Sequence, residues 1–167
     1  MANIEMKEMM NTMPQVGKVE WIGLRQERRG VVLPSTEVDV VADLGLRGDH
    51  HSKAGGKRQI TLIQAEHIEA AASIMGMKQI DPALLRRNIV VRGLNLVALK
   101  DHRFTIGSVI FETTGECHPC SRMEENLGPG GYNAMRGHGG ITARILSDGT
   151  IAVGDTVKMI PNEHEKD

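Results

Sequence analysis

Short runs that alternate apolar and polar residues, separated by turns rich in glycine, proline or aspartate, constrain this chain more than any other feature. Evenly spaced short strands with few helices are typical of a β-barrel or a sandwich. Only residues 65–75 show the clear period of an amphipathic helix, so a doubly wound sheet is not expected. The sequence therefore predicts a mainly β protein with a few short helices. The strands are expected at residues 16–23, 31–34, 37–42, 58–63, 89–91, 94–99, 103–106, 108–114, 141–146, 150–153 and 156–160.

The same pattern predicts one domain with a tail at each end. Residues 1–15 have no stable period and contain Pro14, which indicates an N-terminal tail or a loosely docked helix. Residues 161–167 are charged and predict a C-terminal tail, which leaves one domain at residues 16–160. Within that domain, Ser-Asp-Gly at residues 147–149 predicts a hairpin turn between its two flanking strands.

Charge and composition exclude several classes of partner. The formal net charge of −1 and the aromatic content of 2% argue against nucleic acid, which needs a basic face or stacking platforms. No apolar run reaches the length of a membrane span, and the N-terminus does not resemble a signal peptide. Two cysteines do not make a disulfide scaffold, so we expect a reduced, cytoplasmic protein without nucleic-acid or membrane partners.

Both cysteines lie in one short motif, Cys117 and Cys120, with His118 between them and Arg122 just after. The motif follows a predicted strand, so the sulfurs are expected where that strand ends in a turn. A thiolate is a nucleophile and a soft metal ligand, and nearby cations favour it. This spacing is compatible with a redox dithiol, half of a zinc site, or two small buried apolar side chains.

Histidines elsewhere in the chain keep two further possibilities open. Two of His50, His51, His118 and His138 could complete a zinc site with the cysteines, although the spacing is wrong for a standard finger. His50, His51 or His138 could instead activate a cysteine nucleophile in a hydrolase.

Two basic clusters lie at predicted strand ends beside glycines. This position suits an anionic cofactor, because arginine binds phosphate through two hydrogen bonds; a solvated surface is the alternative. The glycine-rich stretch 128–140 is either a set of tight turns or a loop that approaches a ligand. The clusters comprise Arg47, His50, His51, Lys53, Lys57 and Arg58, and Arg86, Arg87 and Asn88.

Six segments together resemble the MOSC domain, the C-terminal domain of molybdenum cofactor sulfurases, over roughly residues 16–160. They occur in the family's order at residues 45–51, 86–91, 104–107, 117–122, 137–144 and 149–157. The resemblance implies a β-barrel of the pyruvate-kinase-barrel type. It also implies that Cys120 is the family's defining cysteine and ligates molybdenum, and that Arg86 and Asn88 bind the molybdenum cofactor. Arg87 stands where the family often has proline. The cofactor-binding side chains expected on this basis and from the basic clusters are Arg47, His50, Lys53, Arg86, Asn88, His118, Arg122 and His138.

The resemblance also implies a function. Molybdenum would reduce an N-hydroxylated or related small-molecule substrate with electrons from a separate donor protein, or Cys120 would carry sulfur received from a sulfur-donor protein. Pyridoxal phosphate is not expected, because the fused desulfurase that binds it is absent from this sequence. The alternatives are a non-catalytic barrel that binds a cofactor or protein, and a structural zinc protein.

Overall fold

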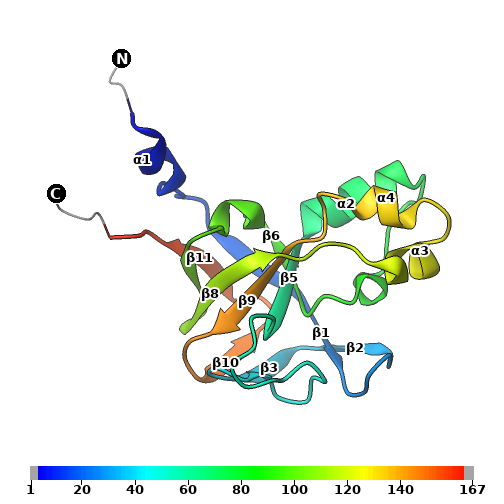
Figure 1. Ribbon diagram of the computed structural model, residues 1–167, viewed down its shortest axis with the longest axis horizontal. Helices are drawn as coiled ribbons and strands as arrows, with labels where there is room; N and C mark the ends of the chain where they lie inside the picture. Colours follow the sequence, from blue (N-terminus) through cyan, green and yellow to red (C-terminus); the bar gives the residue numbers. More distant parts are fainter. Residues whose placement is uncertain (1–3, 164–167) are drawn as a thin grey trace.

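The computed structural model describes residues 4–163 of the 167-residue chain (Figure 1). The ends of both predicted tails, residues 1–3 and 164–167, lie outside the described residues. The described part of the N-terminal stretch contains one short helix, α1 (Met6–Met10), none of whose residues is buried. No helix between residues 4 and 163 has the length and apolarity that crossing a bilayer requires.

Within residues 4–163, seven strands close into a barrel. The order around the barrel is β1, β6, β5, β9, β8, β7 and β11, and β11 pairs again with β1. Gly17 opposite Val157 belongs to this closing pair. Neighbours are antiparallel except β5 and β6, which are parallel and joined through a helix. The predicted mainly β barrel with few short helices is thus confirmed. The bounds are β1 (Gly17–Arg25), β5 (Ile60–Gln64), β6 (Ile89–Arg92), β7 (Arg103–Ile106), β8 (Val109–Glu116), β9 (Ile141–Ile145) and β11 (Thr156–Ile160).

Strand β2 (Val32–Ser35) extends the barrel sheet beside β1, and three short strands form a second sheet. The second sheet shows that the predicted hairpin is wrong. Strand β9 pairs with β5 and β8, whereas the next strand pairs with β3. Asp148 in the turn instead accepts a hydrogen bond from the backbone N–H of Ala42, at 2.7 Å. The second sheet consists of β3 (Glu37–Val41), β4 (Gly45–Leu46) and β10 (Gly149–Ala152).

Helices gather at one end of the barrel, as Figure 1 shows for α2, α3 and α4. The predicted helix is confirmed as α2 (Ala65–Ile74), which buries Ile68, Ala71 and Ala72 and is followed by Gly76 at φ +69°. The expected strand at 94–99 is wrong, because its last four residues form the 3₁₀ turn η2 (Leu96–Leu99). The remaining helices are η1 (Pro82–Leu85), α3 (Ser121–Leu127) and α4 (Gly131–Met135).

Two apolar clusters fill the described part of the molecule. The first fills the barrel and includes Phe104 and Phe111, whose rings stack with centroids 5.2 Å apart. The second lies between the barrel wall and the helices and includes Ile63, Leu85 and Met123. Strand β5 is buried along its whole length because it contributes to both clusters. The helical end is therefore packed onto the barrel rather than appended to it.

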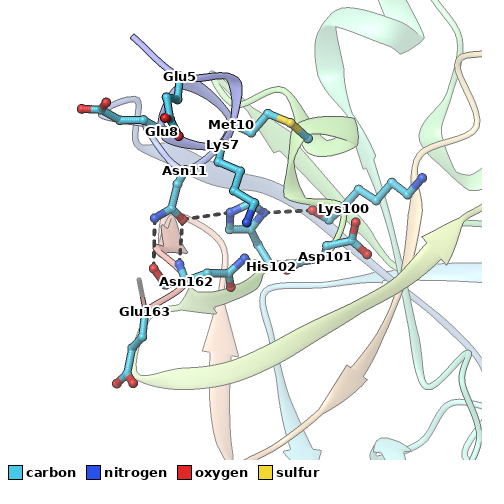
Figure 2. A pocket seen from close by; sticks show the side chains of 10 residues that line it. All are labelled: Glu5, Lys7, Glu8, Met10, Asn11, Lys100, Asp101, His102, Asn162 and Glu163. Carbon is cyan, nitrogen blue, oxygen red and sulfur yellow. Dashed lines mark hydrogen bonds between the residues drawn. The ribbon is translucent and has the colours of Figure 1, made fainter. Parts of the chain in front are cut away.

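The first and last described segments are joined side by side. Asn11 donates from Nδ2 to the carbonyl of Asn162 (3.0 Å) and accepts from its backbone N–H at Oδ1 (2.7 Å). The same Oδ1 lies 3.1 Å from Nε2 of the buried His102 (Figure 2). Asn11 thereby fixes the point at which the chain leaves the barrel towards α1.

Candidate functional site

A pocket of about 260 Å³ opens beside Cys120 and is lined almost entirely by cationic or titratable side chains. Within the described chain, seven arginines line it and no carboxylate does. A pocket with this lining attracts anions, because arginine forms paired hydrogen bonds with phosphate and carboxylate groups. Its lining residues are Arg25, Arg28, Arg29, His50, His51, Arg58, Arg86, Arg87, Cys120, Arg122 and Met123.

These residues come from segments that are distant in sequence. Arg25 ends β1, and the loop from β1 to β2 carries the next two arginines. Arg86 follows η1 in the left-handed region, at φ 61° and ψ 23°, and its Nη1 donates to the carbonyl of Gly30 at 3.1 Å. This bond holds the β1–β2 loop against the end of η1. Cys120 occupies the N-cap position of α3, which begins at Ser121, and its side chain makes no capping hydrogen bond.

Asn88 lies behind this lining, and its amide is occupied by protein partners. Its Oδ1 accepts from the backbone N–H and the hydroxyl of Thr61, both at 3.1 Å. Its Nδ2 donates to the carbonyl of Gly23 (3.2 Å) and to Asp49 Oδ1 (3.4 Å). With these four contacts the amide has no free donor, so Asn88 acts on the pocket by holding strands and Asp49 in place.

Asp49 is the buried carboxylate behind the cationic side chains. Its oxygens accept from the backbone N–H groups of Arg25 (2.8 Å) and His51 (3.1 Å). Burial and the charges of Arg25 and Arg58 lower the pKa of His51, and the charge of Asp49 opposes this. His51 is therefore biased towards its neutral form within the cationic cluster.

Arg87 connects the loops around the cysteines. Its buried guanidinium donates to the carbonyls of Gly139 (2.9 Å) and Leu85 (2.9 Å). It also donates to the carbonyls of Cys117 (3.3 Å) and His118 (3.4 Å). Burial lowers the pKa of Arg87, while the charge of the Cys117 thiolate would raise it. This one side chain thus fixes three segments relative to each other. They are η1, the loop at residues 117–120 between β8 and α3 (the cysteine loop), and the loop at residues 136–140 between α4 and β9 (the glycine loop).

The two cysteines have different environments. Cys117 is 2% exposed, and its backbone N–H donates to Gly140 at 2.8 Å. Cys120 is an exposed free thiol in the pocket wall. Burial and the charge of Arg122 lower the pKa of Arg86, and the thiolate charge of Cys120 opposes them. The exposed cysteine is therefore the one that a ligand in the pocket can reach.

Four predicted site residues meet in this pocket, namely Cys120, His50, Arg86 and Arg122. Three others lie outside its lining: Arg47 and Lys53 are exposed on the loop after β4, and His118 is exposed with Nε2 4.0 Å from Glu116. Their assignment to cofactor binding stays a prediction, as does that of Asn88.

His138 also lies away from the pocket, at the interface between α2 and the end of α4. Its ring packs edge-on against His67 with centroids 5.0 Å apart, and its Nδ1 lies 2.9 Å from the carbonyl of Ala134. Burial and the charge of His138 lower the pKa of His67, and Glu66 opposes this.

Three arginines of the pocket were not predicted from the sequence: Arg25, Arg28 and Arg29. Their segment has the composition of a solvated loop, and only the bond from Arg86 to Gly30, 56 residues away, shows where it lies. The available signal was three arginines within five residues, directly after a strand.

Among residues 4–163, no group of three or more His, Cys, Asp or Glu side chains is placed to hold a metal ion. The closed four-ligand site that the zinc alternative requires is therefore not found in that part of the chain.

Comparison with known proteins gives a family and a fold. The family model described as "MOSC domain" matches residues 48–158. The YUAD protein from Bacillus subtilis is similar in structure, with a TM-score of 0.77 and 21% identity over 91% of this chain and 100% of that one. YiiM from Escherichia coli has a TM-score of 0.67 and 15% sequence identity, over 89% of this chain and 72% of that one. YiiM from Geobacillus stearothermophilus has a TM-score of 0.67 and 19% sequence identity, over 86% of this chain and 75% of that one. No curated protein matches the chain.

Proposed function

The chain belongs to the MOSC domain family, and on that premise we propose that the pocket around Cys120 binds the molybdenum cofactor, with Cys120 as the protein ligand of the metal. One observation carries the proposal: a single exposed thiol lies among seven arginines in a pocket lined, within residues 4–163, by no carboxylate. A soft thiolate suits molybdenum, and arginines suit the phosphate of the pterin.

The chemistry of the donor set fits this cofactor. Cys120 supplies the sulfur. Arg86 supplies a guanidinium group that feels the charges of both Arg122 and Cys120. Behind them, the buried side chains of Arg87 and Asn88 donate hydrogen bonds to backbone carbonyls and so hold the neighbouring segments in place. A buried supporting shell of this kind is what keeps a binding site in one geometry.

When bound, the cofactor supplies two-electron redox chemistry. We propose that the protein acts as an oxidoreductase on an N-hydroxylated or related small molecule, with electrons from a separate donor protein. The chain's own residues bind and orient the anionic groups and hold Cys120 at the pocket wall. Both cysteines are free thiols and Cys120 must remain reduced, so the proposal places the protein in the cytoplasm.

Sulfur transfer is the second candidate function, and the exposure of Cys120 favours it. A thiol at the molecular surface is accessible to a sulfur-donor protein, whereas Cys117 is not. In this role the Cys120 thiolate would attack the outer sulfur of a persulfide on the donor protein, the donor's thiolate would leave, and Cys120 would hold the transferred sulfur as its own persulfide.

The deciding experiment measures molybdenum and pterin in protein produced in a host that makes the cofactor. We expect about one of each per chain in the wild type and in Cys117→Ala, and neither in Cys120→Ala. Arg86→Gln should lower the content, while Arg92→Gln, which removes an exposed arginine paired with Glu20, should not. Zinc in place of molybdenum would revive the structural zinc alternative. The absence of metal from all five proteins would overturn cofactor binding, and mass spectrometry of Cys120 would then test for a persulfide.

A further inference from the structure

The pocket holds more positive charge than one cofactor phosphate neutralises. The chain as a whole is nearly neutral, with 20 Lys and Arg against 21 Asp and Glu, yet seven of those cations line this one pocket. Among residues 4–163, only Arg122 of the seven has a carboxylate within ion-pair distance, Glu125 at 3.2 Å. The other six are not neutralised by ion pairs in the described chain.

The cations lie close enough to lower the pKa of one of their number, Arg25. Burial lowers the pKa of Arg25, and the charges of Arg86, Arg58 and Arg87 lower it further. The opposing charge is that of Asp49, whose oxygens already accept bonds from backbone N–H groups. Repulsion among fixed cations is relieved when anions bind between them.

A single phosphate would leave most of this positive charge unbalanced. A phosphate monoester carries about −1.5 to −2 charges near pH 7. Even after Arg122 is set aside with Glu125 and Arg25 with Asp49, five arginines remain. A second anionic group of similar charge is needed to approach neutrality.

Two pairs of these arginines come from different segments of the chain. Arg86 and Arg122 interact with each other, and Arg86 also interacts with Cys120. Arg28 and Arg29 belong to the β1–β2 loop and are exposed. The bond from Arg86 to Gly30 places that loop directly beside the first pair, so one pocket contains both.

We propose that Arg28 and Arg29 form a second phosphate subsite, and that the small-molecule substrate of this pocket is phosphorylated. The assignment to the substrate rests on the proposed function, in which Arg86 and Arg122 hold the cofactor phosphate. The exposed subsite lies at the surface, where a ligand that exchanges during turnover can enter and leave.

The test counts phosphate sites in cofactor-free protein by equilibrium dialysis with labelled inorganic phosphate at constant ionic strength. We expect two sites per chain in the wild type and one in Arg28→Gln/Arg29→Gln. Arg29 already has φ 61°, and glutamine is no worse there, so the backbone cost is unchanged. The matched control Arg103→Gln/Lys158→Gln removes two exposed cations on β7 and β11 that do not line the pocket, and should keep both sites. One site in the wild type, or equal loss in the control, would overturn the subsite.

A second arm separates the substrate from an extended cofactor that carries its own second phosphate. Cofactor-loaded protein should still bind one phosphate, and the double variant in its loaded form should bind none. No phosphate bound by loaded wild-type protein would assign both subsites to the cofactor and overturn the substrate assignment. The metal analysis is independent: loss of molybdenum binding with two phosphate sites retained would defeat the proposed function alone.

Discussion

The guanidinium of Arg87 lies 2.9 Å from the carbonyl oxygen of Gly139, and this bond joins the turn after η1 to the glycine loop behind the cysteines. The backbone there is too close for any larger residue at position 139. A Cβ on Gly139 would lie 1.9 Å from the carbonyl oxygen of Cys117. The geometry of the cysteine loop therefore depends on the large side chain of Arg87 and on the absence of a side chain at position 139.

Replacing Arg87 with methionine should lower the free energy of unfolding by about 2–3 kcal/mol, because several buried carbonyls lose their donor. Urea denaturation measures this. The matched change Arg92→Met removes an exposed arginine with two surface ion pairs and should cost at most about 1 kcal/mol. Equal losses in the two variants would show that the buried bonds of Arg87 add nothing.

Gly139→Ala should displace the cysteine loop and cost about 3 kcal/mol, since the new methyl group overlaps a backbone oxygen. Gly128→Ala is the control: it has φ +90° but nothing within 4 Å of the added Cβ. Its expected cost is about 1 kcal/mol, from backbone strain alone. Urea midpoints would decide, and a milder effect at position 139 than at 128 would contradict the close approach.

Iodoacetamide should modify native wild-type protein once, at Cys120, because Cys117 is 2% exposed. Cys120→Ala should then resist modification, whereas Cys117→Ala should react like the wild type. Intact-mass spectrometry gives the count. Rapid modification of Cys117 in folded protein would mean that the cysteine loop opens readily in solution.

His67 should make stability fall in mild acid. Its folded-state pKa is lowered by burial and by His138, so the unfolded chain binds more protons as pH drops below the ordinary value of about 6.5. Its contribution is complete above that value and is lost towards the lower folded pKa. Urea midpoints of wild type and His67→Phe, compared at about pH 8 and pH 5.5, should converge or cross in favour of the variant at the lower pH. A constant difference would rule this linkage out.

Asn11→Ala should release the N-terminal segment without unfolding the barrel. The variant loses both bonds to Asn162 and the contact with His102 (Figure 2). Limited trypsin digestion should cleave faster at Lys7, with thermal unfolding of the remainder unchanged. Thr12→Ala, whose exposed hydroxyl bonds only within the segment, should digest at the wild-type rate.

The strands of the barrel could be predicted because each is a local pattern in the sequence. Which strands pair with each other is not encoded locally. The run 150–153 was recognised, but its partner is β3, more than a hundred residues earlier, rather than β9 across the Ser-Asp-Gly turn. Turn chemistry describes how a chain reverses, not which strand it then joins. Asp148 uses its side chain to bond Ala42, so the same residues that suggest a hairpin serve a long-range contact.

Cys120 and Arg86 belong to short motifs in which chemically reactive or charged residues are concentrated, and the structure places both in one pocket. Arg28 and Arg29 were missed because a charged loop looks the same whether it faces water or a pocket. His138 lies near the cysteines in sequence and in the same family segment as the glycine loop, yet its ring packs on α2. Spacing along a chain fixes neither the direction of a side chain nor its partner.

Closure of the barrel has a consequence for how this protein is made. Gly17 of β1 pairs with Val157 of β11, so the ribosome adds 140 residues between the synthesis of these two partners. At about 5–20 residues per second, the ribosome takes roughly 7–28 s to supply the second strand. Throughout that interval β1 presents an unpaired edge on the side that β11 will occupy. The nascent chain is therefore most exposed to mispairing and to chaperones before its last strand emerges.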